Sequence, residues 1–386
     1  MHPRLCVRTF LTLSLDEQPF GPIGLEVVDL SLNCEGITPV NKLARLPASA
    51  RPQRRISRLA VLPVLAAAVL ATVQVATASA APAPAWQVSS TIAVGDVPNQ
   101  FALSPDAAHL YVTAGDGIDI IDTATNTVIA SAATPTSVTG ISVAPTGDIY
   151  AVSSVGTVYV IDPQTNTVID DIAVEPNSIG MTASGDAVYV ASPTSGTISV
   201  IDTATNTVES TVPVGKNPVL ATALDGTVYV TNAGSGTVTA IDSASDTVVE
   251  TIPTGGIPVG ITSAAGRVFA VEGTSQSVVV IDTSTNTVID TIAVGGGTLT
   301  GIAVTPDGST IFVNQSDTDT TAIIDTADPG SRKTVPVGAR PGGAIALPDQ
   351  TTAYVTNGEA ASVSVLTTAA QPCTGIACIP TGSFGG

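Results

Sequence analysis

Short apolar stretches alternate with clusters of small and polar residues along most of the chain. The segment 290–326 shows the pattern once: the stretches TIAVG, TGIAVTP, TIFVN and TTAIID are separated by Gly, Pro, Asn and Asp. Val, Ile, Ala, Thr and Gly dominate these stretches, which favours strands over helices. Because Gly, Pro, Asn and Asp supply tight turns, we expect each such segment to form four strands joined by hairpins.

This pattern returns about every 40 residues. The marker is an aspartate that ends the last stretch of a unit, and it occurs at Asp122, Asp162, Asp202, Asp242 and Asp282, each 40 residues apart, and again at Asp325 after a longer unit. The second stretch occurs seven times, beginning near residues 99, 139, 178, 219, 259, 300 and 342. A period near 40 with strand-like content is typical of a β-propeller. We predict an all-β fold, a seven-bladed β-propeller of four-stranded antiparallel blades, over residues 87–368.

One aromatic residue in the third stretch of each unit gives the same count. These residues are Tyr111, Tyr150, Tyr189, Tyr229, Phe269, Phe312 and Tyr354. We interpret them as side chains that pack between adjacent blades, since stacked sheets fill space in this way. The alternative is a stacking platform for a ligand.

The two ends of the repeat array predict how the ring closes. The last unit ends at residues 362–368 without an outer strand, whereas the stretch WQVSSTIAVG (86–95) is an outer strand that precedes the first unit. We expect residues 87–94 to complete the seventh blade beside residues 363–366. This pairing would remove the open edge of the last sheet.

The aspartates of the repeat lie in the motif VIDTSTNTVID (280–290) and its copies. Carboxyl and hydroxyl groups at fixed spacing suit a metal site, a catalytic pair or a hairpin turn. We interpret the six repeated aspartates as turn residues, because Asp282 can accept backbone N–H bonds and Asn286 tolerates a left-handed conformation. In a propeller these turns lie on the face opposite the usual ligand loops.

The N-terminal region predicts export. Arg51, Arg54, Arg55 and Arg58 precede an apolar run (59–73), and an A-x-A cleavage pattern ends at Ala80. We interpret residues 51–80 as a signal peptide and 81–86 as a linker, which predicts an extracellular or cell-surface protein. The alternative, a membrane helix, is less favoured because the run is short and Ala-rich, so we expect no transmembrane segment in the mature chain. We interpret residues 1–50 as a gene-model extension or a disordered segment.

Net charge limits the kinds of partner that the protein can bind, and the cysteines indicate a possible disulfide. The chain has a net charge of −19; without residues 1–80 its 13 Lys and Arg fall to five and its 32 Asp and Glu to 27, which leaves −22. A surface this acidic repels phosphate backbones, so we predict no nucleic-acid partner. In the C-terminal tail (369–386), Cys373 and Cys378 could form a local disulfide in an oxidising compartment, or remain two free thiols.

Several tetrapeptides point to a known family. YVTN occurs at 229–232 and 354–357, and YVTA at 111–114. Together with VIDTxTNTV and GIAVTPDG, they make the sequence resemble the YVTN-repeat, surface-layer-type β-propeller family over about residues 88–368. The resemblance implies a seven-bladed propeller that is exported or lies at the cell surface. It implies little about mechanism, because a fold does not fix a function.

Candidate site residues lie in loops of the face that carries ligands in propellers. Two acidic pairs, Asp116 with Asp119 and Asp317 with Asp319, have oxygen ligands at spacings that suit Ca²⁺. The alternative is a solvated acidic loop, since neither pair completes a calcium-loop motif. Lys216 and Arg340, expected on this face, are candidates for contact with an anionic ligand, or are surface charges. Apart from the Ca²⁺ hypothesis, no cofactor is predicted.

The sequence offers little catalytic chemistry. Residues 81–386 contain one histidine, His109, and the predicted inner strands offer Phe101, Ser104, Met181 and Thr182 among Ala, Gly and Val. A base, a nucleophile and an electrostatic stabiliser are hard to assemble from these residues. We therefore predict a monomeric, non-catalytic scaffold that binds an unknown protein, glycan or cell-wall partner. The alternatives are a metal-assisted hydrolase or lyase that resembles sugar-lactonase propellers, and a structural surface-layer subunit.

Overall fold

The computed structural model describes residues 85–368, which form seven four-stranded antiparallel sheets and no helix. Four sheets, here blades 1 to 4, each follow one continuous segment. Blade 1 has β2 (Phe101–Leu103), β3 (His109–Thr113), β4 (Gly117–Asp122) and β5 (Thr127–Ala133). Blade 2 has β6 (Val138–Val143), β7 (Ile149–Ser153), β8 (Thr157–Asp162) and β9 (Thr167–Ala173). Blade 3 has β10 (Gly180–Ser184), β11 (Ala187–Ser192), β12 (Thr197–Asp202) and β13 (Thr207–Pro213). Blade 4 has β14 (Pro218–Leu224), β15 (Thr227–Asn232), β16 (Thr237–Asp242) and β17 (Thr247–Pro253).

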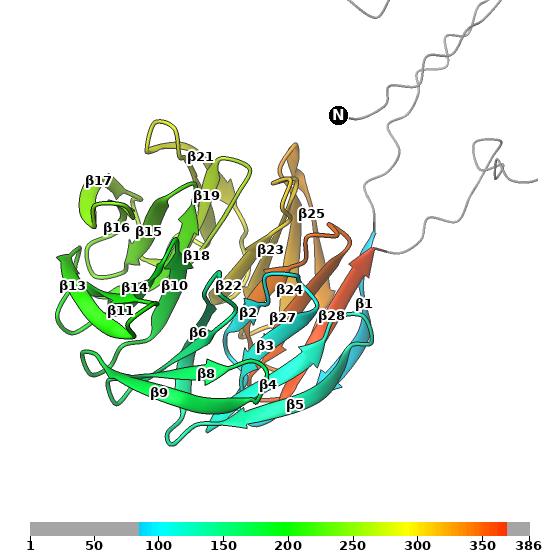
Figure 1. Cartoon of the computed structure of the whole chain (residues 1–386). Helices are drawn as coiled ribbons and strands as arrows, with labels where there is room; N and C mark the ends of the chain where they lie inside the picture. Colours follow the sequence, from blue (N-terminus) through cyan, green and yellow to red (C-terminus); the bar gives the residue numbers. More distant parts are fainter. Residues whose placement is uncertain (1–84, 369–386) are drawn as a thin grey trace, which may run out of the picture. The chain divides into compact units, whose positions relative to one another are not determined.

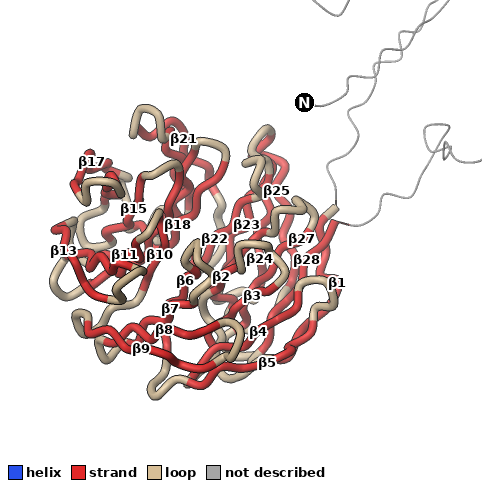
Figure 2. Tube along the Cα trace, in the orientation of Figure 1, coloured by secondary structure: helices blue, strands red, loops and turns tan. Residues whose placement is uncertain are grey.

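Blades 5 and 6 are continuous as well, and blade 7 joins the two ends of the repeat array. Blade 5 has β18 (Pro258–Ala264), β19 (Arg267–Glu272), β20 (Ser277–Asp282) and β21 (Thr287–Ala293). Blade 6 has β22 (Leu299–Val304), β23 (Thr310–Gln315), β24 (Thr320–Asp325) and β25 (Asp328–Pro336). Blade 7 has β26 (Pro341–Ala346), β27 (Thr352–Asn357), β28 (Ser362–Thr368) and β1 (Trp86–Ala93). The blades follow one another around a ring whose innermost strands are β2, β6, β10, β14, β18, β22 and β26 (Figures 1 and 2). The predicted seven-bladed propeller is confirmed.

The ring closes as the sequence predicts. β1 pairs antiparallel with β28, with Trp86 opposite Thr368 and Ile92 opposite Val363. Trp86 also packs edge-on against Phe312 of blade 6, with ring centroids 4.7 Å apart and planes at 87°. The strand from the start of the array therefore completes the last sheet and contacts the neighbouring blade (Figure 1).

The aromatic residue of each blade is buried in the packed interior. All seven aromatics are at most 4% exposed, and they belong to clusters of apolar side chains drawn mostly from adjacent blades. Four tyrosines also form a hydrogen bond to the next blade around the ring. Each tyrosine hydroxyl donates to the side chain of an Asn or Asp in the turn between the third and fourth strands of that next blade. The pairs are Tyr150–Asn206 (2.8 Å), Tyr189–Asp246 (2.8 Å), Tyr229–Asn286 (2.8 Å) and Tyr354–Asn126 (2.6 Å).

The two phenylalanines occur where this bond has no acceptor. Phe269 of blade 5 precedes blade 6, whose third and fourth strands are joined through Thr326 and Ala327 rather than the usual four-residue turn. Phe312 of blade 6 precedes blade 7, where the fourth strand is β1 and no such turn exists. A buried hydroxyl without a partner is costly, so Phe suits these two positions.

Blade 6 departs from the repeat at its outer strand. Asp325 pairs with Asp328, but Ile323 pairs with Lys333, so Pro329–Arg332 form a bulge that is larger than the one-residue bulge at the equivalent place in the other blades. None of the described residues forms a helix that is long and apolar enough to cross a bilayer. The predicted signal peptide, the segment 1–50 and the tail with Cys373 and Cys378 lie outside the described residues.

Candidate functional site

The central channel is lined by the seven innermost strands and encloses about 370 Å³. Its lining is apolar or hydroxylic apart from the amide of Gln100, with Phe101 on blade 1, Met181 on blade 3, and Thr182, Thr222 and Thr262 on three successive blades. Among the described residues, none that lines this channel is ionisable. Ser104, which we also placed on an inner strand, instead bonds Asp106 at the end of β2 (2.6 Å). The channel thus offers polar contacts without a proton-transfer group.

The two faces of the ring are named by their connections. The loop face carries the connection from each outer strand to the next blade and the one between second and third strands. The turn face carries the other two hairpins of each blade. This arrangement follows from the strand order and direction within each sheet.

A recurring slot on the loop face is filled by the residue three positions after the aromatic. The seven occupants are Ala114, Ser153, Ser192, Asn232, Glu272, Gln315 and Asn357. In blade 4, Asn232 accepts the N–H of Gly215 (3.1 Å) and donates to the hydroxyls of Thr237 (3.2 Å) and Thr239 (2.8 Å). The Asn of each YVTN tetrapeptide therefore ties the incoming loop to the third strand; Asn357 makes the same set of bonds in blade 7.

In blade 1 the slot residue is Ala114, and Asp119 replaces the missing amide. Asp119, 8% exposed, accepts the N–H of Gly95 (2.7 Å) and the hydroxyl of Ser131 (2.5 Å). Its predicted partner Asp116 is exposed and accepts the hydroxyl of Ser137 (2.5 Å). The two carboxylates accept hydrogen bonds from different segments of the fold, and both sets of bonds are structural.

The second acidic pair also divides between two loops. Asp317 accepts the N–H of Thr298 (2.7 Å), at the entry to blade 6, and Asp319 accepts the N–H of Arg340 (2.9 Å), at the entry to blade 7. Nowhere in residues 85–368 do three or more His, Cys, Asp or Glu side chains gather as metal ligands would. The Ca²⁺ hypothesis gains no cluster from this part of the chain.

The predicted basic residues are exposed on the loop face. Arg340 forms an ion pair with Glu359 (3.1 Å), in which the two side chains are 66% and 60% exposed. Exposed pairs of this kind contribute little to stability. Lys216 lies in the preceding loop of blade 4, where its N–H donates to Ser235. Both side chains are therefore accessible to a partner.

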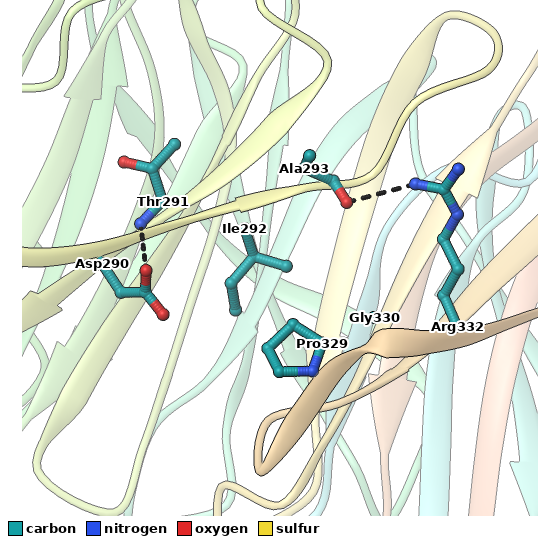
Figure 3. Close-up of a pocket in the computed structure, with 7 residues that line it drawn as sticks. All are labelled: Asp290, Thr291, Ile292, Ala293, Pro329, Gly330 and Arg332. Atoms are coloured by element: carbon teal, nitrogen blue, oxygen red, sulfur yellow. Dashed lines mark hydrogen bonds between the residues drawn. The ribbon is translucent and has the colours of Figure 1, made fainter.

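A second cavity lies outside the channel, beside the bulge of blade 6. It measures about 390 Å³ and is bounded by Asp290–Ala293 of β21 and by Pro329, Gly330 and Arg332 of β25. Figure 3 shows Arg332 reaching across to the carbonyl oxygen of Ala293 (3.3 Å). Asp290 accepts the N–H of Thr291 (2.7 Å) at the other end. The cavity lies where the bulge of blade 6 is larger than that of the other blades.

The repeated aspartates all lie on the turn face. Asp282 accepts the N–H and hydroxyl of Ser284 (2.9 and 2.5 Å) and the N–H of Thr285 (3.2 Å), and Asn286 adopts φ +52°. The Ser284 hydroxyl, followed by its N–H, holds the pKa of Asp282 below its ordinary value. Asp122, Asp162, Asp202 and Asp242 accept equivalent bonds. Asp325 accepts only the N–H of Ala327 (2.8 Å), because its turn is shorter.

Glu272 is the slot residue that sequence inspection missed. It is fully buried, and neither carboxylate oxygen has a hydrogen-bond partner within residues 85–368. Burial raises its pKa, and the nearby hydroxyl of Thr254 offsets this only in part. When VFAVEG (268–273) is aligned with VYVTNA (228–233), Glu272 takes the position of Asn232. This alignment of the two repeats is the sequence signal that could have identified Glu272.

These features define a seven-bladed β-propeller with an uncharged channel and two chemically different faces. A family model described as a domain of unknown function (DUF5074) matches residues 85–217, from the closing strand through blade 3. Hydrazine synthase of Kuenenia stuttgartiensis is a similar solved structure, with a TM-score of 0.65 and 20% sequence identity, over 71% of this chain and 96% of that chain. At this identity the likeness concerns the fold. No curated protein matches the sequence.

Proposed function

We propose that the protein is an exported, non-catalytic β-propeller that binds a protein or glycan of the cell envelope through its loop face. The supporting observation is the distribution of sequence variety. Five blades repeat one hydrogen-bonded turn on the turn face, whereas the loop-face slot holds five residue types. Binding residues concentrate on varied loops held by a rigid scaffold.

The partner chemistry follows from charge. Exposed side chains of both signs, including Lys216, Arg340 and Glu359, lie on the loop face. The turn face carries the repeated aspartates and would repel an anionic polymer. A partner with polar groups of mixed sign therefore fits the loop face better. No cluster of described residues favours the metal-assisted hydrolase alternative.

Co-sedimentation with isolated cell envelopes of the producing organism tests this function. The full chain should sediment with the envelopes, and Arg340→Ser should reduce the bound fraction severalfold. Lys333→Ser is the matched control, because Lys333 is an exposed cation on the outer strand of blade 6. If the wild-type chain stays in the supernatant, or if both variants bind like it, the proposal is wrong.

Export has its own test. Mass spectrometry of the culture medium should find a product that begins near residue 81. An intracellular product that retains residues 51–80 would contradict export.

A further inference from the structure

Glu272 occupies a slot that amides fill in three other blades. In blade 6, Gln315 has the same side-chain length, and its amide nitrogen donates to the carbonyl oxygens of Gly295 (2.7 Å) and Gly296. Its amide oxygen accepts the hydroxyl of Thr320 (3.0 Å). The Gln315 amide thus donates to the incoming loop and accepts from the third strand, and a carboxylate cannot donate.

The cover over Glu272 is a glycine loop. A Cβ built on Gly256 would lie 2.2 Å from a carboxylate oxygen of Glu272, so the loop backbone rests directly on the acid. Gly255 has φ +85°, a conformation that side chains disfavour. Ile257, in the same loop, is 42% exposed on the loop face. The loop 254–257 therefore closes tightly over the acid, and none of its backbone N–H groups donates to the carboxylate.

Within the part of the chain that the structure describes, no charged group acts on the Glu272 carboxylate. The adjoining segments 254–264, 273–281 and 294–298 contain no ionisable side chain, and Asp282 lies at the opposite end of β20. The third-strand position that holds Thr239 in blade 4 is Val279 in blade 5, so one hydroxyl of the slot is lost. The pKa of Glu272 is raised by burial, and no charged neighbour acts on it. An ionised, unpaired carboxylate in such a place is strongly unfavourable.

We infer that Glu272 makes the loop 254–257 pH-dependent: protonated Glu272 acts like an amide and keeps the loop closed, and ionised Glu272 releases it. The direction follows from linkage. A carboxyl whose folded pKa exceeds its unfolded value binds the proton more tightly when folded, so the closed state weakens as pH rises above the unfolded value of 4.5. This inference does not depend on the proposed binding function. If that function also holds, acidity would control the shape of the binding face.

Hydrogen exchange of the full chain tests the inference, with wild type and Glu272→Gln compared at the same pH. At about pH 8, amides 255–257 should exchange on the order of tenfold faster in wild type, because the glutamine keeps the loop closed at every pH. Near pH 4 the two proteins should coincide. The loops 215–217 and 338–340, which Asn232 and Asn357 hold, are internal controls and should be unchanged.

Gln315→Glu provides the reciprocal variant. It should transfer the pH dependence to the loop 295–297 of blade 6, and it tests the inference even if Glu272→Gln folds poorly. Equal exchange in wild type and Glu272→Gln at both pH values would overturn the inference. So would slowing of amides 255–257 by added CaCl₂ in wild type alone, since this result would make the slot a cation site.

Discussion

On the turn face, five blades carry the same aspartate-bonded turn, whereas on the loop face the bonds that hold the incoming loop differ among the blades. Asn232 uses an amide, Asp119 reaches the equivalent glycine from the third strand, and the Glu272 side chain has no hydrogen-bond partner among the described residues. The turn-face bonds are exposed and join residues two or three positions apart, but the loop-face bonds to the incoming glycine are part-buried and join residues 17 and 24 positions apart. The comparison indicates that the turn, which every blade needs, keeps the same hydrogen bonds. The hydrogen bonds that hold the incoming loops differ among blades, and because their side chains are buried, each difference affects stability.

Removing a loop-face tie should have the largest effect. Asn232→Leu leaves the N–H of Gly215 and the hydroxyls of Thr237 and Thr239 without their buried partner. We expect a loss of about 2–3 kcal/mol in the free energy of unfolding, measured by urea denaturation. Asn217→Gly, in the same loop at φ +52°, is the control and should stay within about 0.5 kcal/mol. A loss below that of the control would mean that the tie is not structural.

The inter-blade hydroxyl bond should have a smaller effect. Tyr229→Phe removes the bond to Asn286 and should cost about 1 kcal/mol by the same measurement. The opposite change, Phe269→Tyr, adds a hydroxyl where blade 6 offers no Asn or Asp acceptor in its turn, and it should also destabilise. Stabilisation by Phe269→Tyr would show that the aromatic type is unrelated to the turn of the next blade.

The exposed turns should show their effect mainly in acid. The turn bonds lower the folded pKa of Asp282 and its four equivalents below 3.8, so their stabilisation is present above about pH 3.8 and is lost as pH falls through the folded value. Replacing these five aspartates with Asn should therefore flatten the decline of the melting temperature between about pH 4 and pH 2. If the melting temperature of the variant falls as steeply in acid as that of the wild type, the turn aspartates do not cause the acid loss of stability.

The sequence predicted the architecture because the same pattern of strands and turns occurs seven times along the chain. The 40-residue spacing, the aromatic in each third stretch and the unpaired outer strand at 86–95 each indicate the same ring, and β1 closes it as expected. The candidate site was harder to predict, because side-chain partners depend on which loops meet. Asp119 looked like a loop ligand, but it lies inside β4 and bonds Gly95. Glu272 was overlooked because a lone acid in a strand has no local signature.

The tyrosine-to-turn bonds also set the unit in which this ring can be re-engineered. Because the hydroxyl of Tyr189 needs the turn of blade 4, and that of Tyr229 the turn of blade 5, the smallest exchangeable module spans two sheets. A copy of blade 4 inserted after itself would find both a donor and an acceptor. A copy of blade 6 in that place would leave Tyr229 facing a turn without a partner. Phe269 and Phe312 therefore mark the two places in the ring, before blade 6 and before blade 7, where a tyrosine-bearing blade does not fit.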